Sequence, residues 1–256
     1  MRQPMTIMDD GIRLSAVLET PAGAAGACPL VIILHGLTSA MNRPHTLRAA
    51  EAMREAGFAT LRFDLFGHGE SGGEFRRHTL YKWIANTMAV IDRMRALGYT
   101  DLYLSGHSQG GLVAAVAGGM EADRIRGLIL RAPAFMIPRG ARDGNIPGYR
   151  FDPDRIPDEI PLGPGLVLEG NYIRVARTVN VEEAADRFRG PVLILHGDAD
   201  DVVPLETVRP VADRYENGTL AVIPGESHHF DKHPEEMANL IRNFMIQCKT
   251  ELKGED

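Results

Sequence analysis

A serine in a glycine-rich turn is the first residue of this chain that could act as a nucleophile. Ser108 lies at the centre of the sequence G-H-S-Q-G, between Gly106 and Gly110. This G-x-S-x-G pattern is typical of a sharp strand-to-helix turn, in which the flanking glycines avoid steric clashes and the hydroxyl is exposed. A serine hydroxyl is a weak nucleophile at neutral pH, so it needs a histidine base and a carboxylate that orients this base. Average composition produces the pentapeptide in roughly a tenth of chains of this length, so these two partners must be found elsewhere in the chain.

The candidate acid lies in a loop after a later apolar segment. Residues 192–195 are predicted to form a buried strand, and the loop 196–204 that follows reads H-G-D-A-D-D-V-V-P. Where a serine stands on such a turn, the expected chain order is serine, acid, histidine, with the acid after a strand. Asp198 and Asp201 compete with Asp200 for this role, since both could be ordinary turn or helix-capping carboxylates.

The candidate base follows the next apolar segment. Residues 220–223 are predicted to form a strand, which leads into P-G-E-S-H-H-F with His228 and His229. Adjacent side chains point in different directions in a regular backbone, so one of the two is the base and the other lines the pocket or lies on the surface. His35 and His107 flank the backbone of the predicted site, and we interpret them as structural groups that hold loops by hydrogen bonds.

Two backbone N–H groups are needed to stabilise the oxygen that becomes negative when a carbonyl group is attacked. One is predicted to come from Gln109, the residue after the nucleophile, and the other from the loop after an early strand. The sequence His35-Gly36-Leu37 occupies that loop, so Leu37 is the predicted second donor. Gly36 lets this backbone approach the reacting atoms closely.

The elements that would position these residues alternate between strands and helices. Such alternation predicts a mostly parallel sheet with helices on both faces, and ligands on such sheets bind at the carboxyl ends of the strands. An opening hairpin of residues 5–9 and 12–19, turning at Asp10-Gly11, is expected at the sheet edge, followed by a loop over 21–29. The expected strands are 30–34, 58–64, 102–104, 125–130, 191–196 and 219–223, and the expected helices are 44–56, 79–97, 112–117, 181–188, 205–215 and 234–249.

Residues 133–178, which we call the lid segment, interrupt this alternation. Seven of the 16 prolines fall between Pro133 and Pro164, and no long periodic segment occurs there. Long stretches of this kind inside a compact domain are usually functional. Since the segment follows the sixth strand, beside the serine strand, we expect it to roof the active site. The chain is therefore predicted to be a single domain, 1–256, with this lid insertion.

Overall composition excludes several classes of partner. The chain has 256 residues, 44% of them hydrophobic, and a formal net charge of -6, which speaks against nucleic acid or an anionic membrane as the partner. Cys28 and Cys248 are the only cysteines, so a disulfide scaffold is not expected. Whether either has a role stays open. No leader-like or membrane-spanning pattern is seen, and we expect a cytoplasmic protein.

A second glycine-rich motif and the nine histidines suggest two other site classes. The segment 67–72 fits G-x-G-x-x-G, but a dinucleotide-binding turn opens directly into a helix, and here residues 73–78 intervene before the helix expected at Thr79. No helical H-x-x-x-H pair or Cys/His cluster occurs in the sequence. We predict no metal and no other cofactor.

In these motifs the chain resembles the serine hydrolases of the α/β-hydrolase fold. In that family a serine elbow, a strand-end H-G-x-x-D-x-x-V-P and a late G-x-x-H-x-F recur in this order. The resemblance covers essentially the whole chain, and the glycine motif at 67–72 matches a structural D-x-x-G-x-G-x-S loop of the same family. It implies that Ser108 is the nucleophile, Asp200 the acid and His228 the base.

The lid segment is similar to that of bacterial cinnamoyl or feruloyl esterases, which release hydroxycinnamic acids from plant-derived esters. The similarity implies that Tyr172 borders the acyl pocket, with Phe135, Met136 and Ile137 as apolar walls, while His229 is a further candidate pocket residue. The stretches that carry it are Ala132-Pro133-Ala134, Gly144-Asn145, Phe151 to Pro157 and Asn171 to Arg174.

The predicted function is hydrolysis of a small-molecule ester through an acyl-enzyme, with a hydroxycinnamate ester as the expected substrate. A broad carboxylesterase or a monoacylglycerol lipase shares the same catalytic residues. An acyl-coenzyme A thioesterase lacks support from a basic cluster, and a non-catalytic binding protein would not need all three catalytic residues. The edge hairpin could form a homodimer contact or be covered or charged.

Overall fold

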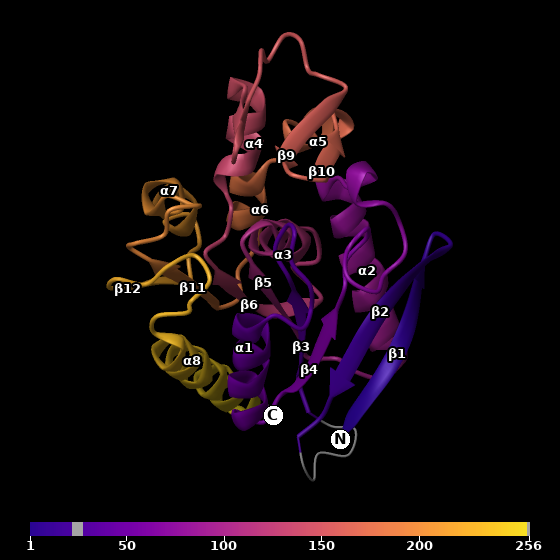
Figure 1. Cartoon of the computed structure of the whole chain (residues 1–256). Helices are drawn as coiled ribbons and strands as arrows, with labels where there is room; N and C mark the ends of the chain where they lie inside the picture. The colour runs from indigo at the N-terminus through magenta and orange to yellow at the C-terminus, as the bar shows by residue number, and fades with distance from the viewer. Residues whose placement is uncertain (22–27, 255–256) are drawn as a thin grey trace.

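The structure is a computed structural model that describes residues 1–21 and 28–254. Within these residues an eight-stranded sheet crosses the molecule in the order β1-β2-β4-β3-β5-β6-β11-β12 (Figure 1). β1 and β2 pair antiparallel, as do β2 and β4, and the later pairings are parallel. The mostly parallel sheet is thus confirmed. The strands are β1 Arg2–Asp9, β2 Ile12–Glu19, β3 Leu30–Leu34, β4 Ala59–Phe63, β5 Leu102–His107, β6 Ile125–Arg131, β11 Val192–Gly197 and β12 Gly218–Ile223.

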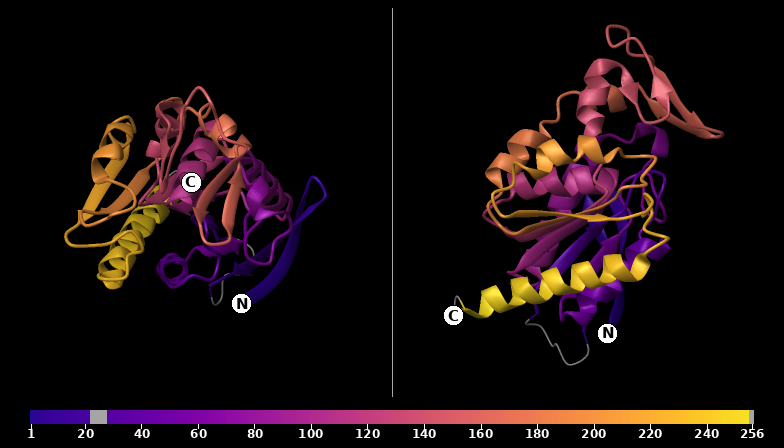
Figure 2. Two further views of the ribbon diagram at one scale, coloured as in Figure 1. Left: turned by 45° about the horizontal axis from the view of Figure 1, so that its top comes forward. Right: turned by 90° about the vertical axis from the view of Figure 1, so that its left-hand side faces the viewer.

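Helices cover both faces of this sheet, and Figure 2 shows α8 crossing one of them. α1 and α8 pack together on that face, whereas α2, α3 and α6 cover the other. In β3, Ile32 packs with the second group of helices and Ile33 with the first, which explains why the strand reads as an uninterrupted apolar run. The helices are α1 Pro44–Glu55, α2 Leu80–Ala96, α3 Gln109–Met120, α6 Val181–Arg187, α7 Arg209–Ala212 and α8 Pro234–Gly254.

Two expected elements can be compared with the structure in detail. The opening hairpin is confirmed, and Asp10 and Gly11 turn it with φ angles of 47° and 76°, as a two-residue turn requires. The single helix expected over 205–215 is wrong. A short 3₁₀ turn, Leu205–Thr207, precedes the four-residue α7, because Pro210 has no N–H to continue a helix from the preceding turn. Most of the loop expected over 21–29 lies outside the described residues.

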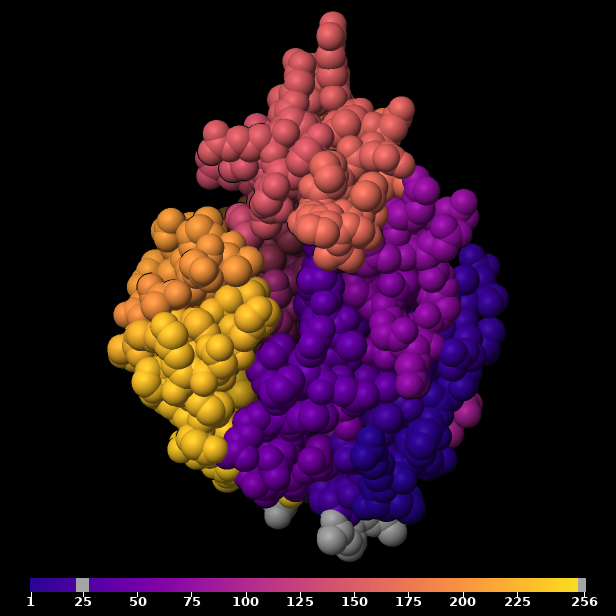
Figure 3. Space-filling model, in the orientation of Figure 1, coloured from indigo at the N-terminus to yellow at the C-terminus, as the bar shows by residue number. Residues whose placement is uncertain are grey.

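The lid segment follows β6 and lies above the carboxyl ends of the strands (Figure 1). In the space-filling view it projects from the top of the molecule (Figure 3). It contains two short helices and two small antiparallel strand pairs instead of one long element. Within the part of the chain described here, no helix combines the length and the apolar character needed to cross a membrane. The lid elements are α4 Met136–Asp143, β7 Asn145–Ile146, β8 Tyr149–Arg150, β9 Glu159–Gly163, β10 Leu166–Glu169 and α5 Asn171–Ala176.

Candidate active site

The candidate nucleophile stands on a strained turn between β5 and α3. Ser108 has φ 54° and ψ -123°, a conformation that side-chain-bearing residues rarely adopt. Its N–H donates to the carbonyl of Arg131 at 2.9 Å, which ties the turn to the neighbouring strand β6. A Cβ on Gly106 would collide with the Gly110 carbonyl, and one on Gly110 would collide with the His35 carbonyl. The two glycines therefore allow the turn to pack tightly against its own helix and against the early loop.

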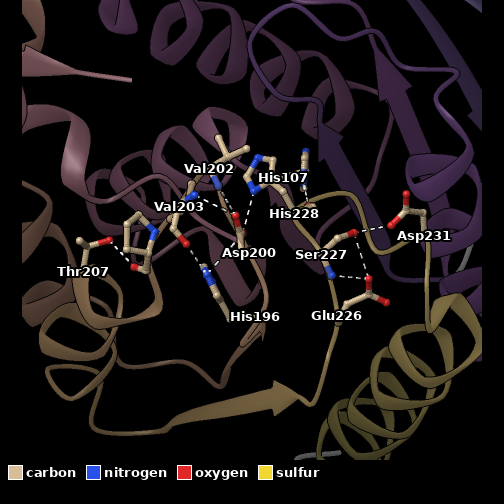
Figure 4. Close-up of polar contacts among 11 residues, drawn as sticks. His107, His196, Asp200, Val202, Val203, Thr207, Glu226, Ser227, His228 and Asp231 are labelled. Atoms are coloured by element: carbon tan, nitrogen blue, oxygen red, sulfur yellow. Dashed lines mark hydrogen bonds and ion pairs between the residues drawn. The ribbon is translucent and has the colours of Figure 1, made fainter. Parts of the chain in front are cut away.

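A histidine and an aspartate from two neighbouring strand ends form a hydrogen-bonded pair (Figure 4). The Nδ1–H of His228 donates to Oδ2 of Asp200 at 2.8 Å. The other oxygen, Oδ1, accepts from the N–H groups of Val202 at 2.9 Å and Val203 at 2.8 Å. Burial raises the pKa of Asp200, but these hydrogen bonds outweigh burial and lower the pKa overall. The carboxylate is thus ionised, and it leaves Nε2 of the histidine as the free, basic nitrogen.

The competing carboxylates and the competing histidine have other positions. Asp198 and Asp201 are exposed, and Asp198 accepts a hydrogen bond from the N–H of Gly225 at 2.5 Å. His229 is exposed, and the centroids of the His228 and His229 rings are 5.2 Å apart. His229 also lines the cavity that contains Ser108. Burial of part of the ring and the adjacent His228 lower the pKa of His229, so this imidazole is neutral at neutral pH.

Two buried imidazoles hold this pair in place. Nε2–H of His107 donates to the carbonyl of His228 at 2.8 Å, and Nε2–H of His196 donates to the carbonyl of Val203 at 2.8 Å. Burial lowers the pKa of both rings, which makes them neutral donors. In the early loop, His35 accepts from the N–H of Leu65 at 3.0 Å, so it also serves a structural role.

Glu226 is a buried carboxylate that sequence reasoning missed. One of its oxygens accepts from the N–H of Ser227 at 2.6 Å, and the other accepts from the N–H of His233 at 2.6 Å. A third N–H, that of Lys232, lies 3.3 Å from the first oxygen. The carboxylate therefore closes the loop that carries His228 from both sides. Its place two residues before His228, next to a turn glycine, was the available sequence signal.

Leu37, in the loop after β3, and Gln109, at the start of α3, both line the cavity that contains Ser108. Gln109 is the first residue of α3, so its N–H has no partner inside the helix. In the described ranges, neither N–H donates to a protein acceptor. Both donors are therefore available to an oxygen bound beside the serine, which is the requirement for an oxyanion hole.

A cavity of about 270 Å³ lies between these groups and the lid segment. Of the predicted pocket residues, Met136, Ile137, Tyr172 and His229 line it. Phe135 does not, because its side chain is 4% exposed and packs into the main hydrophobic core, so the prediction that it forms a pocket wall is not supported. The full lining comprises Gly36, Leu37, Thr38, Ser39, His107, Ser108, Gln109, Ala134, Met136, Ile137, Ile146, Pro147, Leu162, Leu168, Tyr172, Val202, Val203, His228 and His229.

Tyr172 joins the lid segment to the serine turn. Its hydroxyl donates to Oε1 of Gln109 at 2.7 Å, and Nε2 of Gln109 lies 2.6 Å from Nε2 of His78. Burial raises the pKa of the Tyr172 phenol and lowers the pKa of His78, so all three groups are uncharged. The chain of bonds fixes the side chain of Gln109 while its backbone N–H remains at the cavity. His78 and the Gln109 side chain were not singled out from the sequence.

Three imidazoles lie near the Asp200–His228 pair. Among the described residues, they form the one group whose ligand atoms are close enough together to hold a metal ion. His45, His107 and His229 have ligand atoms within 4.8 Å of one another. Nη1 of Arg131, whose guanidinium is fully buried, lies 3.3 Å from Nδ1 of His45. A cation at this depth strongly repels a second one, so the guanidinium opposes metal binding. That the protein needs no metal stays a prediction.

The glycine motif at 67–72 forms a tight loop that is tied to Asp64. The Asp64 carboxylate accepts from the N–H of Met41 at 2.8 Å and from that of Glu70 at 2.9 Å. A Cβ on Gly69 would collide with the same carboxylate. An acidic group at the centre of the loop leaves no place for a phosphate, which agrees with a structural turn.

A serine on a sharp turn at the edge of a cavity, an Asp-paired histidine and the strand order of this sheet define a serine hydrolase of the α/β-hydrolase class. The family model described as serine aminopeptidase, S33, matches residues 26–147. The structure of Est1E from Butyrivibrio proteoclasticus with bound ferulic acid is 44% identical, covers 96% of this chain and 99% of that chain, and has a TM-score of 0.94. The chain belongs to the same family of α/β-hydrolase esterases as Est1E, and it is a serine ester hydrolase.

The chain is also similar to more distant relatives whose names state other activities. Palmitoyl-protein thioesterase ABHD10 of Bos taurus is 28% identical over 211 residues, which are 77% of this chain and 65% of the relative. The chain thus spans just under two thirds of that protein. A monoacylglycerol lipase of Mycolicibacterium smegmatis is 24% identical over 252 residues, with 81% of this chain and 83% of the relative covered.

Proposed function

We propose that the protein hydrolyses esters of hydroxycinnamic acids, with Ser108 as nucleophile, His228 as base and Asp200 as the orienting acid. The observation that carries this substrate class is the similarity to the Est1E structure that holds ferulic acid, which extends over nearly all of both chains. Because 96% of this chain is covered, the similarity extends to most of the lid segment. This class of acid has a planar aromatic ring and a short unsaturated arm.

In the proposed reaction, each step is assigned to one of these residues. Nε2 of His228 accepts the proton of the Ser108 hydroxyl while Oγ attacks the ester carbonyl carbon. The carbonyl oxygen takes the negative charge and is bound by the N–H groups of Leu37 and Gln109. The histidine then gives its proton to the alcohol oxygen as the C–O bond breaks. Water, deprotonated by the same histidine, cleaves the acyl-enzyme and restores the serine.

The acyl cavity favours a small aromatic acid over a long alkyl chain. Its volume of about 270 Å³ lies near the lower limit of ligand cavities, which is roughly 300 Å³. Apolar side chains of the lid segment, including Met136, Ile137 and Leu168, line it together with the buried Tyr172. A palmitoyl chain or the acyl chain of a monoacylglycerol would need a longer channel. The small volume of the cavity is therefore the physical reason for preferring hydrolysis of hydroxycinnamate esters to the thioesterase and monoacylglycerol lipase activities in the names of the distant relatives.

The test is a comparison of kcat/KM on matched esters. We expect methyl ferulate and methyl caffeate to be hydrolysed faster than methyl octanoate, methyl esters of longer acids, monoacylglycerols and palmitoyl-coenzyme A. The Ser108→Ala variant should lose the activity and also its labelling by a fluorophosphonate probe. Good turnover of short p-nitrophenyl esters with methyl ferulate left intact would show that the substrate assignment is wrong. Failure of the wild type to be labelled would contradict the roles given to the three residues.

The remaining attributes are predictions that rest on the sequence. Cys28 and Cys248 are both free thiols in the structure. Free thiols fit the proposed cytoplasmic location. The homodimer is proposed because β1 is the edge strand of the sheet and could pair with a second copy. Size-exclusion chromatography with light scattering tests the dimer.

A further inference from the structure

A second cavity, of about 730 Å³, adjoins the acyl cavity. The two share Leu37, Thr38, Ser39 and His229, but Ser108 and the lid segment line only the first. The second cavity lies where α1 and α8 begin, two helices that pack side by side (Figures 1 and 3). Its lining comprises Leu37, Thr38, Ser39, Arg43, Pro44, His45, Arg48, His229, Phe230, Asp231, Pro234 and Glu235.

The position of this cavity relative to the reacting groups suggests what it binds. In the tetrahedral intermediate the acyl group and the alcohol oxygen point away from the carbonyl carbon in different directions. The apolar cavity under the lid accommodates the acyl group, and the oxyanion loop at Leu37 lies at the boundary between the two cavities. The alcohol oxygen must lie next to His228, which protonates it, and His229 is the adjacent residue that lines both spaces.

We propose that the second cavity is the subsite for the alcohol component of the ester, and that Arg43 recognises a carboxylate on this component. The proposal extends the proposed ester hydrolysis and depends on it. The preferred substrate is then an ester formed by the hydroxyl group of a hydroxy acid, and its alcohol product leaves as an anion.

The charges around the cavity support a carboxylate at Arg43. Arg48 is already paired, at 3.0 Å with Glu51 and also with Glu235. Asp231 accepts a hydrogen bond from the hydroxyl of Ser227. Arg43 is exposed, and its guanidinium has no hydrogen bond or ion pair with any described residue.

The two histidines that line the second cavity are uncharged, so they do not compete with Arg43 for a carboxylate. Burial and the nearby Arg131 lower the pKa of His45 to about 2, and the pKa of His229 is also lowered. Arg43 is therefore the one unpaired cation that the described lining offers, and a guanidinium binds a carboxylate through parallel N–H donors. The hydroxyls of Thr38 and Ser39 can bind further hydroxyl groups of the alcohol component.

The test uses two ferulate esters that differ in one charge. Feruloyl lactate carries a carboxylate on its alcohol component, and feruloyl lactamide carries a neutral amide of nearly the same shape. We expect the wild type to have a higher kcat/KM on the lactate ester. Arg43→Gln should lower the ratio of the two kcat/KM values about fivefold, which is the scale of one partly solvated charge-assisted pair. Arg95→Gln makes the same charge change at the exposed end of α2, outside both cavities, and should leave the ratio unchanged.

Each outcome decides the proposal. An equal ratio in wild type and Arg43→Gln, or an equal change in Arg95→Gln, would overturn it. Folding is not in question, because Arg43 has no side-chain cap hydrogen bond and only its carbonyl supports the first turn of α1. If no feruloyl ester is cleaved but butyrate esters are, the hydroxycinnamate function fails, and butyryl lactate and butyryl lactamide then test the alcohol subsite separately. If no ester is cleaved, both proposals fall.

Discussion

Replacing the buried Glu226 by glutamine should lower kcat although this residue does not reach the cavity. Both of its carboxylate oxygens accept backbone hydrogen bonds in the loop that carries His228. A glutamine has one accepting oxygen, which will stay with Ser227 and Lys232, where more donors converge. The amide NH₂ group must then face the N–H of His233, so two donors oppose each other in a buried position.

The magnitude follows from the lost acceptor. Leaving a buried N–H without a partner costs about 1–3 kcal/mol, which corresponds to a Tm decrease of about 2–4 °C for each kcal/mol in a chain of this size. The loop can regain part of this free energy by shifting, and such a shift moves His228. A displacement of about 1 Å at a catalytic group can reduce the rate by a factor on the order of 100. We therefore expect a decrease of kcat of at least about tenfold, with KM little changed because Glu226 does not line the acyl cavity.

The assay combines steady-state kinetics on methyl ferulate or p-nitrophenyl acetate with thermal melting. Glu206→Gln, at an exposed position beyond β11, makes the same chemical change and should alter neither quantity. Glu226→Asp keeps two accepting oxygens and should recover part of kcat. A Glu226→Gln variant with a lowered Tm but wild-type kcat would refute the reasoning, because it would mean that the carboxylate stabilises the fold without positioning the histidine.

Three further predictions concern the serine turn and the Asp–His pair. Asp200→Asn should reduce kcat by a factor on the order of 10⁴ with the fold retained, since the amide no longer favours the required tautomer of His228; near-normal kcat would exclude Asp200 as the acid. Gly110→Ala should prevent correct folding of the turn, because its Cβ collides with the His35 carbonyl, and soluble active protein would contradict this packing. The lowered pKa of Asp200 contributes stability that is present above its unfolded pKa of about 3.9 and is lost as the pH falls through the folded value. Urea unfolding from pH 6 to pH 3 should therefore show a steeper loss in wild type than in Asp200→Asn.

The serine turn could be predicted from the sequence because a short glycine-rich pattern carries most of its geometry. A Cβ on Gly106 would collide with the Gly110 carbonyl four residues later, which is a local constraint, whereas the need for Gly110 comes from the distant His35 carbonyl after β3. The order of strands and helices was also readable, since buried parallel strands such as β3 are continuous apolar runs. The helix expected over 205–215 failed because a proline inside an otherwise helical pattern was given too little weight.

Roles that depend on the direction in which a side chain points could not be predicted from the sequence in the same way. Phe135 and Met136 are adjacent and both apolar, yet one packs into the core and the other lines the cavity, and only the path of the backbone into α4 decides between them. The bond between Tyr172 and Gln109 joins residues 63 positions apart, and no sequence pattern links them.

The sequence by itself thus determined the class of chemistry, because a serine turn and strand-end loops in a fixed order depend on short-range sterics and on the rules of parallel sheets. Only the tertiary structure decided that Glu226 holds the loop of His228, how large the acyl cavity is and that a second cavity opens beside His229. These properties arise from side chains that converge from distant segments, and their convergence depends on packing across the whole fold.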